Sequence, residues 1–275
     1  MLNTMTFLTA ATQMPSSIPE WWAQYGKMLT EGIWGTIYMT LVSTAIGYLF
    51  GLPMGVALTV TDKDGLRPNA VIYKVLDVIA NIVRSIPFLI LLILLIPFTR
   101  VLVGRSYGTT AVIVPLTIAA IPFIARMVES SLKEVDAGVI EAARSMGASN
   151  WQIITRVLLV EGKTSLIINA TIAMGTILGY SAMAGTVGGG GLGDIAVRYG
   201  YNRYQYDVMF VTVALLIILF QLFQTYGMMI ANHFDRRKGN AMTVVTLVVF
   251  VVLTVLIAVC AGIGIISFIK EMFLK

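Results

Sequence analysis

The chain has 275 residues, of which 57% are hydrophobic and 12% are charged, and its formal net charge is +5. This composition excludes a soluble globular domain, because so few charged side chains cannot cover a surface exposed to water. The basic residues form no stripe with interleaved aromatics in a soluble segment, which excludes a nucleic-acid-binding surface. The sequence therefore predicts an all-α polytopic membrane protein.

Six apolar runs are predicted to cross the membrane as helices. A transmembrane helix needs roughly 20 residues, because the hydrocarbon layer is about 30 Å thick and each residue rises about 1.5 Å. In chain order the runs are 32–61, 85–99 with an upstream extension through Asp77, 106–125, 164–193, 208–232 and 241–269. The chain thus divides into an N-terminal segment 1–29, a core 30–235 and an additional C-terminal helix 241–269.

The distribution of basic residues predicts the orientation in the membrane. Most of the 19 lysines and arginines fall on one face if the N-terminus lies outside, and this face is cytoplasmic by the positive-inside rule. The segment 134–163 between the third and fourth runs is then cytoplasmic. We expect a multi-pass membrane protein with its N-terminus outside, surrounded by lipid.

The cytoplasmic segment contains EAARSMGASNWQIITRVLLV at 141–160, which predicts two short helices joined at a hinge. Gly147 can take the left-handed conformation that ends the first helix. Ser149 and Gln152 have the spacing of a capping box that starts the second helix. Such an elbow suits insertion into a groove on a partner, with small side chains at Ala142 and Ala143 and one charge at Glu141.

Two sets of residues inside the predicted spans point to helix contacts or to a pathway. Glycines every four residues indicate close packing, either within the chain or between two copies; they are Gly47, Gly51 and Gly55 in the first span and Gly175 and Gly179 in the fourth. Polar and soft side chains of the fourth span are candidates for a translocation pathway, or else bond their own helix and fill the core; they are Thr176, Tyr180, Ser181 and Met183.

Two patterns that suggest nucleotide binding lack the required context. GGGGLG at 188–193 fits G-x-G-x-x-G, but no strand precedes it, so a flexible or close-packed loop is the better interpretation. GKT at 162–164 lacks the first glycine of a P-loop. Histidine, cysteine and carboxylates do not cluster as a metal or nucleophile site would require, so we expect neither catalysis nor a metal in this chain.

The segment EAARSMGA resembles the EAA motif of ABC-importer permeases, with Glu141, Ala142 and Gly147 at the motif's positions. The segments at 81–100, 113–129 and 179–201 are similar to those of methionine-importer permeases. This resemblance covers roughly residues 30–235. It implies a type I importer permease bundle that works by alternating access, with the elbow as the contact to an ATPase.

The resemblance also implies a location in the bacterial inner membrane and a set of partners. The partners are a second permease copy in a homodimer, a homodimeric cytosolic ATPase that binds ATP and Mg, and an extracytoplasmic methionine-binding lipoprotein. This chain departs from the family pattern at Val160, where a proline is usual, and in the sixth predicted helix. Two alternatives remain open: a permease for another small amino acid or organic solute, and a membrane scaffold that transports nothing.

Overall fold

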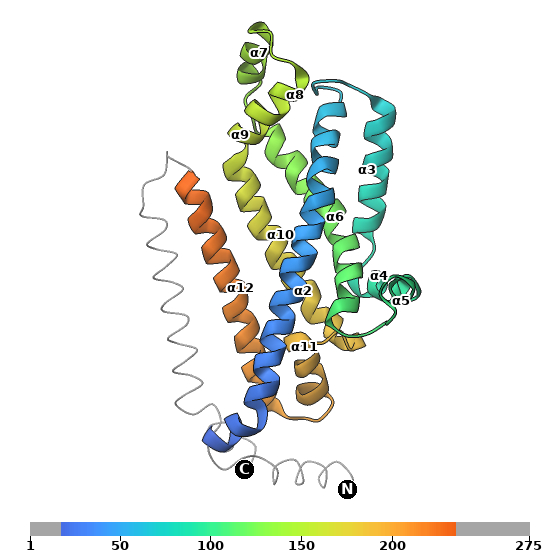
Figure 1. Ribbon diagram of the computed structural model, residues 1–275, viewed down its shortest axis with the longest axis vertical. Coiled ribbons are helices and arrows are strands. Elements are labelled where there is room, and N and C mark those ends of the chain that lie inside the picture. The colour runs from blue at the N-terminus through green and yellow to red at the C-terminus, as the bar shows by residue number, and fades with distance from the viewer. Residues whose placement is uncertain (1–17, 235–275) are drawn as a thin grey trace.

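A computed structural model of the chain describes residues 18–234, which form an all-helical bundle without a strand among them (Figure 1). This confirms the predicted fold class. The helices are α2 (Ile18–Thr61), α3 (Ala70–Ser85), α4 (Phe88–Leu94), α5 (Ile96–Val103), α6 (Thr109–Lys133), α7 (Ala137–Ser145), α8 (Asn150–Gln152), η1 (Ile153–Leu158), α9 (Leu159–Glu161), α10 (Lys163–Ala184), η2 (Gly185–Val187), α11 (Gly191–Ile195), η3 (Ala196–Tyr201) and α12 (Tyr206–Phe234).

Four of these helices, α2, α6, α10 and α12, are long and apolar enough to cross a membrane. They coincide with the first, third, fourth and fifth predicted spans. Figure 1 shows α7, α8 and α9 at one end of the bundle and α11 at the other. We call these the elbow end and the α11 end. The predicted segment 1–29 lies mostly outside the described residues, and the predicted sixth span at 241–269 lies wholly outside them.

The second span differs from its prediction. It is not one helix over 77–99, because α3 and α4 meet at a bend of 99° around Ile86 and Pro87. Proline disfavours helical geometry in the residue before it, and Ile86 is extended, with ψ of 123°. α5 then begins with Pro97 in its first turn, where proline's missing N–H costs nothing. The apolar run therefore folds into a helix and a side branch, which projects from the bundle in Figure 1.

The most extensive contact between two helices of the bundle is that of α2 with α6, and glycines of α2 allow the two helices to come this close. A Cβ added at Gly47 or Gly51 would come within 2.9 Å of atoms of α6. At Gly55 it would come within 2.6 Å of the Ala125 carbonyl oxygen. At Gly51 and Gly55 the nearest atoms include backbone oxygens, and because backbone cannot yield as a flexible side chain can, these two positions exclude any side chain while α2 and α6 keep this distance. The glycines of α2 thus pack within the chain.

The two glycines of α10 have different surroundings. A Cβ at Gly175 would lie 2.7 Å from the Phe220 ring of α12, so this position permits the contact between the two helices. A Cβ at Gly179 would meet nothing within 4 Å. Within residues 18–234, the predicted packing role therefore does not apply to Gly179.

The glycine-rich segment after α10 is a close-packed turn at the α11 end. A Cβ at Gly193 would collide with the backbone of Ala182. The Leu192 amide donates a hydrogen bond of 2.9 Å to Thr36 Oγ1 of α2. The segment therefore closes the bundle at this end, and the alternative of a flexible loop does not hold.

Candidate functional site

The elbow starts directly after α6. Its first helix, α7, is capped by Asp136, whose carboxylate accepts a hydrogen bond of 2.6 Å from the Gly138 amide. A carboxylate at this position compensates the unpaired amides and the positive end of the helix dipole. Only Glu134 and Val135 separate this cap from Lys133, the last residue of α6. The direction of α7 is thus fixed close to the end of a spanning helix.

The hinge after α7 has the geometry predicted for Gly147. Its φ is +79°, in the left-handed region. The Ala148 amide donates to the Ala143 carbonyl at 3.1 Å, and the Gly147 amide donates to the Arg144 carbonyl at 2.9 Å. These two bonds are the pair that defines a Schellman motif. The chain therefore turns sharply with its helix-terminal carbonyls satisfied.

The second arm of the elbow begins with the predicted capping box. Ser149 Oγ accepts from the Gln152 amide at 3.3 Å, and Gln152 Oε1 accepts from the Ser149 amide at 2.8 Å. The helix continues with one π-helical segment, η1, which the sequence did not predict. Ile153 and Leu158 of η1 are buried in the main core, so this arm is anchored to the bundle.

The exposed surface of the elbow differs in part from the predicted one. Glu141 and Ala142 are exposed, as insertion into a groove requires. Ala143 is only 5% exposed and belongs to the core, which corrects its assignment to the partner-facing surface. Its small side chain instead lets α7 pack on the chain itself.

Two residues at the hinge were missed by sequence analysis. Met146 is 81% exposed and Trp151 is 72% exposed. Large apolar side chains this exposed outside the spanning helices are typical of a surface that binds another protein. The signal was available, because both flank the predicted hinge in an otherwise polar stretch.

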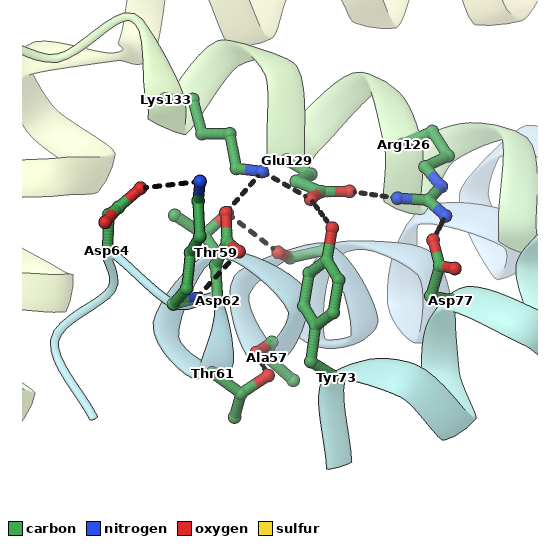
Figure 2. A network of polar contacts seen from close by, with 12 residues as sticks. Ala57, Thr59, Thr61, Asp62, Asp64, Tyr73, Asp77, Arg126, Glu129 and Lys133 are labelled. Carbon is green, nitrogen blue, oxygen red and sulfur yellow. Dashed lines mark hydrogen bonds and ion pairs between the residues drawn. The ribbon is translucent and has the colours of Figure 1, made fainter. Parts of the chain in front are cut away.

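Beside the elbow lies a group of charged residues that we call the polar seam. It joins α6 to α3 and to the end of α2 (Figure 2). Its members are Asp62, Tyr73, Asp77, Asn81, Arg126, Glu129 and Lys133. Sequence analysis did not assign it. The available signal was the spacing of Arg126, Glu129 and Lys133, which places three charges on one face of a helix.

Glu129 is the centre of the polar seam. Its side chain is 6% exposed and lies between two cations, with Arg126 Nη1 at 2.7 Å and Lys133 Nζ at 2.8 Å. The Tyr73 hydroxyl donates a third bond of 3.3 Å. A buried carboxylate is tolerated when it is paired and hydrogen-bonded in this way.

Each cation of the polar seam also binds a second carboxylate on another helix or loop. Arg126 pairs with Asp77 of α3, and Lys133 pairs with Asp62 at the end of α2, at 2.7 Å. The Lys133 ammonium bonded to Asp62 holds the pKa of that carboxyl below its ordinary value. Three segments distant in sequence are therefore tied together by charge at the elbow end.

The candidate pathway residues of α10 do not share one face. Thr176 and Met183 lie seven residues apart and are partly or fully exposed on the side where Gly179 is also open. Ser181 is buried, and its hydroxyl donates to the Leu178 carbonyl at 2.7 Å, so its assignment to the pathway is corrected. Tyr180 stacks on Phe88 of α4, with ring centroids 4.6 Å apart and an angle of 5° between the planes.

Comparisons with known proteins agree with this geometry. Residues 47–240 match the family described as "Binding-protein-dependent transport system inner membrane component". The "Probable D-methionine transport system permease protein MetI" of Vibrio cholerae serotype O1 is 48% identical over 222 residues, which cover 81% of this chain and 99% of that protein. The "D-methionine transport system permease protein MetI" of Escherichia coli strain K12 is 52% identical over 158 residues, 58% of this chain and 73% of that protein.

Solved structures of ABC transporters also resemble this chain. A chain from an inward-facing crystal form of the MetNI methionine ABC transporter is 49% identical, with a TM-score of 0.76, and the match covers 80% of this chain and 100% of that one. An amino acid ABC transporter crystallised with histidines shares the fold, at 21% identity and a TM-score of 0.62. The chain therefore belongs to the family of inner-membrane components of binding-protein-dependent transport systems, among the permeases of the MetI type, and is a multi-pass inner-membrane protein.

Proposed function

We propose that this chain is the permease subunit of an ATP-driven importer that carries methionine across the inner membrane by alternating access. The substrate follows from relatives that are named for D-methionine transport and are matched over 99% and 73% of their length. The observation that carries the proposal is the elbow. Its Schellman turn and capping box build a rigid projection, and a protein that only spans a membrane has no use for one.

The elbow is proposed to insert into a groove of a cytosolic ABC ATPase dimer, which binds ATP and Mg and performs the hydrolysis. Glu141 supplies a polar contact and Ala142 permits close approach. Met146 and Trp151 supply the buried apolar contacts that give protein interfaces most of their binding energy. Gly147 sets the angle between the two arms. The chain itself has no catalytic role in this scheme.

Two permease copies are proposed to enclose the pathway between them. The open side of α10, with Thr176, Gly179 and Met183, is a suitable pathway lining, because no other helix within residues 18–234 covers it. Tyr180 borders this side, where it stacks on Phe88 of α4. An extracytoplasmic substrate-binding lipoprotein delivers methionine to the α11 end. In this arrangement the N-terminus lies outside and the elbow at 134–163 lies in the cytoplasm, as the distribution of basic residues requires.

The test is methionine uptake by proteoliposomes that contain this chain, its ATPase and its binding protein. Uptake and methionine-stimulated ATP hydrolysis that require all three components support the proposal. ATP-driven uptake of another solute would keep the architecture and overturn the substrate. Failure to associate with any ABC ATPase would overturn the function and leave a membrane scaffold.

The role of the elbow is tested by a charge reversal, Glu141→Lys. We expect the variant to reach the membrane, because Glu141 is exposed and its side chain supports no fold contact, and to lose methionine uptake. Asp64→Lys is the matched control, since Asp64 is also an exposed acidic residue at the elbow end but lies outside the elbow. Normal uptake by Glu141→Lys would contradict the coupling assignment.

A further inference from the structure

α3 is attached to the bundle by polar contacts rather than by apolar packing. Ala80 is its only buried residue. Most of its long apolar side chains are exposed, with Val71 at 73% and Ile82 at 58%, whereas Leu76 and Val83 are half-buried. The side toward α6 carries Tyr73, Asp77 and Asn81, which repeat every four residues and so form one row along the helix. The position of α3 relative to α6 therefore depends on the polar seam.

The α6 side of this contact is continuous with the elbow. Lys133, Glu129 and Arg126 occupy the last turns of α6, and the elbow begins within three residues of Lys133 (Figure 2). Glu129 accepts a hydrogen bond from the Tyr73 hydroxyl. Arg126 donates hydrogen bonds to Asp77 and, at 3.2 Å, to Asn81. A displacement of the elbow thus acts first on the helix end that carries these charges.

The far end of α3 leads to the candidate pathway. After the 99° bend, α4 begins with Phe88, which is buried and stacks on Tyr180 of α10. Phe88 and Asp77 belong to one continuous stretch of chain, in which α3 is helical up to Ser85. A movement of α3 along its axis therefore displaces Phe88 against Tyr180.

We propose that α3 is a lever held by the polar seam, through which motion of the elbow reaches the stacked pair Phe88 and Tyr180. Asp77 and Glu129 are then positioning residues for transport, acting through Arg126 and α3 on the pathway. The inference rests on the proposed ATP-driven function. Separating an ion pair in a medium of low dielectric constant costs much free energy, because the separation leaves an uncompensated buried ion. α3 consequently follows α6 without any repacking of an apolar core.

A purely structural role for the polar seam makes a different prediction. If the polar seam only stabilises the fold, every variant of it should lower the stability of the permease and leave unchanged the number of methionine molecules carried per ATP. A lever predicts a change in that ratio. The lever also predicts that, when the polar seam is disrupted, the elbow still moves in response to ATP but α4 no longer does.

The experiment uses two fluorescent reporters in the complete complex of permease, ATPase and binding protein in lipid nanodiscs. Cys260 is the only cysteine in the sequence, so a Cys260→Ala background is free of others. Val139→Cys labels the elbow and Ile90→Cys labels α4, since both side chains are exposed and neither belongs to the polar seam, the aromatic stack or the proposed ATPase contacts. The measured quantity is the fluorescence change of each reporter on addition of a non-hydrolysable ATP analogue.

In the Cys260→Ala background with Asp77 intact, we expect both reporters to respond. In Asp77→Asn the elbow response should persist, the α4 response should fall to less than half, and methionine carried per ATP should drop several-fold. Asp77→Glu, which keeps the carboxylate, should restore both values. Asp64→Asn is the matched control, because its ion pair with Lys63 is exposed on both sides and lies outside the seam.

Tyr73→Phe provides a milder variant that removes one hydroxyl and preserves the ring, and we expect it to reduce the α4 response in part. An undiminished α4 response and an unchanged transport ratio in both Tyr73→Phe and Asp77→Asn would overturn the lever. A complex with Asp77 intact whose elbow reporter ignores the ATP analogue would instead overturn the proposed function, and the lever with it.

Discussion

Gly147 occupies a backbone conformation that only glycine adopts without strain. Its φ is +79°, and an added Cβ would meet nothing within 4 Å, so replacement by alanine adds backbone strain and no collision. The strain is roughly 1–2 kcal/mol. We expect Gly147→Ala to change the angle between the elbow's arms and to reduce methionine uptake in proteoliposomes while the protein still reaches the membrane.

The control for this prediction is Gly104→Ala. Gly104 has the same φ of +79°, caps α5, and also has nothing within 4 Å of an added Cβ. Both variants therefore carry the same backbone penalty, and their melting temperatures in detergent should fall alike. Only the elbow variant should lose uptake. Equal uptake by the two variants would show that the elbow hinge tolerates the change.

Asp62 gives the polar seam a dependence on pH. Its pKa is lowered by the hydrogen bond from Lys133, so the native state favours the ionised carboxylate more than the unfolded chain does. The resulting stabilisation is present above the ordinary carboxyl pKa of about 3.9 and is lost as the pH falls through the native pKa of Asp62. We expect the melting temperature of Asp62→Asn to lie below that of the unaltered chain at pH 7 and the difference to shrink as the pH falls below the ordinary carboxyl pKa of about 3.9.

Asp64→Asn separates this effect from general acid sensitivity. Asp64 is only two residues away, but its ion pair with Lys63 is 3.8 Å long and exposed, and such pairs contribute little to stability. The melting temperature of Asp64→Asn should equal that of the unaltered chain at every pH. A difference for Asp62→Asn that stays constant from pH 7 to pH 3 would contradict the role given to its charge.

At the scale of elements, the contact between α2 and α6 leaves no room for added volume at Gly55. A methyl group at Gly55 would lie 2.6 Å from the Ala125 carbonyl oxygen, so the two helices must separate to admit it. Overpacking of this kind costs typically 1–3 kcal/mol. We expect Gly55→Ala to lower the melting temperature in detergent and the amount of protein recovered from the membrane.

Gly179→Ala is the matched control within a spanning helix. An added Cβ there meets nothing within 4 Å, and alanine is the better helix former. Its melting temperature as an isolated permease should equal or exceed that of the unaltered chain. A loss as large as that of Gly55→Ala would show that α10 is packed more tightly than its open surroundings imply.

Sequence reasoning succeeded for elements whose signals are local. The hinge at Gly147 and the capping box of Ser149 and Gln152 depend on neighbours within a few residues, and the structure shows both. The spanning helices also follow from composition, because length and apolarity suffice to identify them. Their predicted starts were less accurate, since α2 already begins at Ile18 within a stretch that contains charges.

The predictions that failed concern the directions that helices take and the contacts between residues far apart in the sequence. Hydropathy reports that 85–99 is apolar, but it carries no information on the 99° bend that makes this stretch a side branch. The polar seam pairs Arg126 with Asp77, 49 residues away along the chain, and no local pattern names that partner. Ala143 and Ser181 were misplaced for a related reason, because which side of a helix is covered depends on tertiary packing.

At the scale of the whole molecule, the two ends of the bundle are built differently. The α11 end is closed by glycines in close backbone contact. The elbow end is anchored to the core by Ala143, Ile153 and Leu158, and it is also held by ion pairs and by the Arg144 bond of 3.3 Å to the Leu66 carbonyl. Paired charges on long side chains let a helix end shift while each charge keeps its partner, whereas close backbone contact leaves no such freedom. This difference places the adjustable end at the elbow, where ATP-driven motion is proposed to enter.

The permease function should reside in the part of the chain that its relatives share. About four fifths of this chain matches 99% of the Vibrio cholerae MetI protein, and the family match ends at residue 240. We therefore expect a chain that ends at Asn240, without the predicted helix 241–269, to retain methionine uptake with its ATPase and binding protein. Proteoliposome uptake, normalised to the amount of assembled complex, measures this.

A chain that ends at Tyr204 is the control, because it also lacks α12. α12 packs on α10 through Phe220 at Gly175 and through Gly227 at Thr171, so its removal exposes α10 and should prevent assembly. If the chain ending at Asn240 assembles with the ATPase but transports no methionine, the segment after residue 240 takes part in transport itself. The proposed restriction of the pathway to the shared core would then be wrong, although the coupling through the elbow would stand.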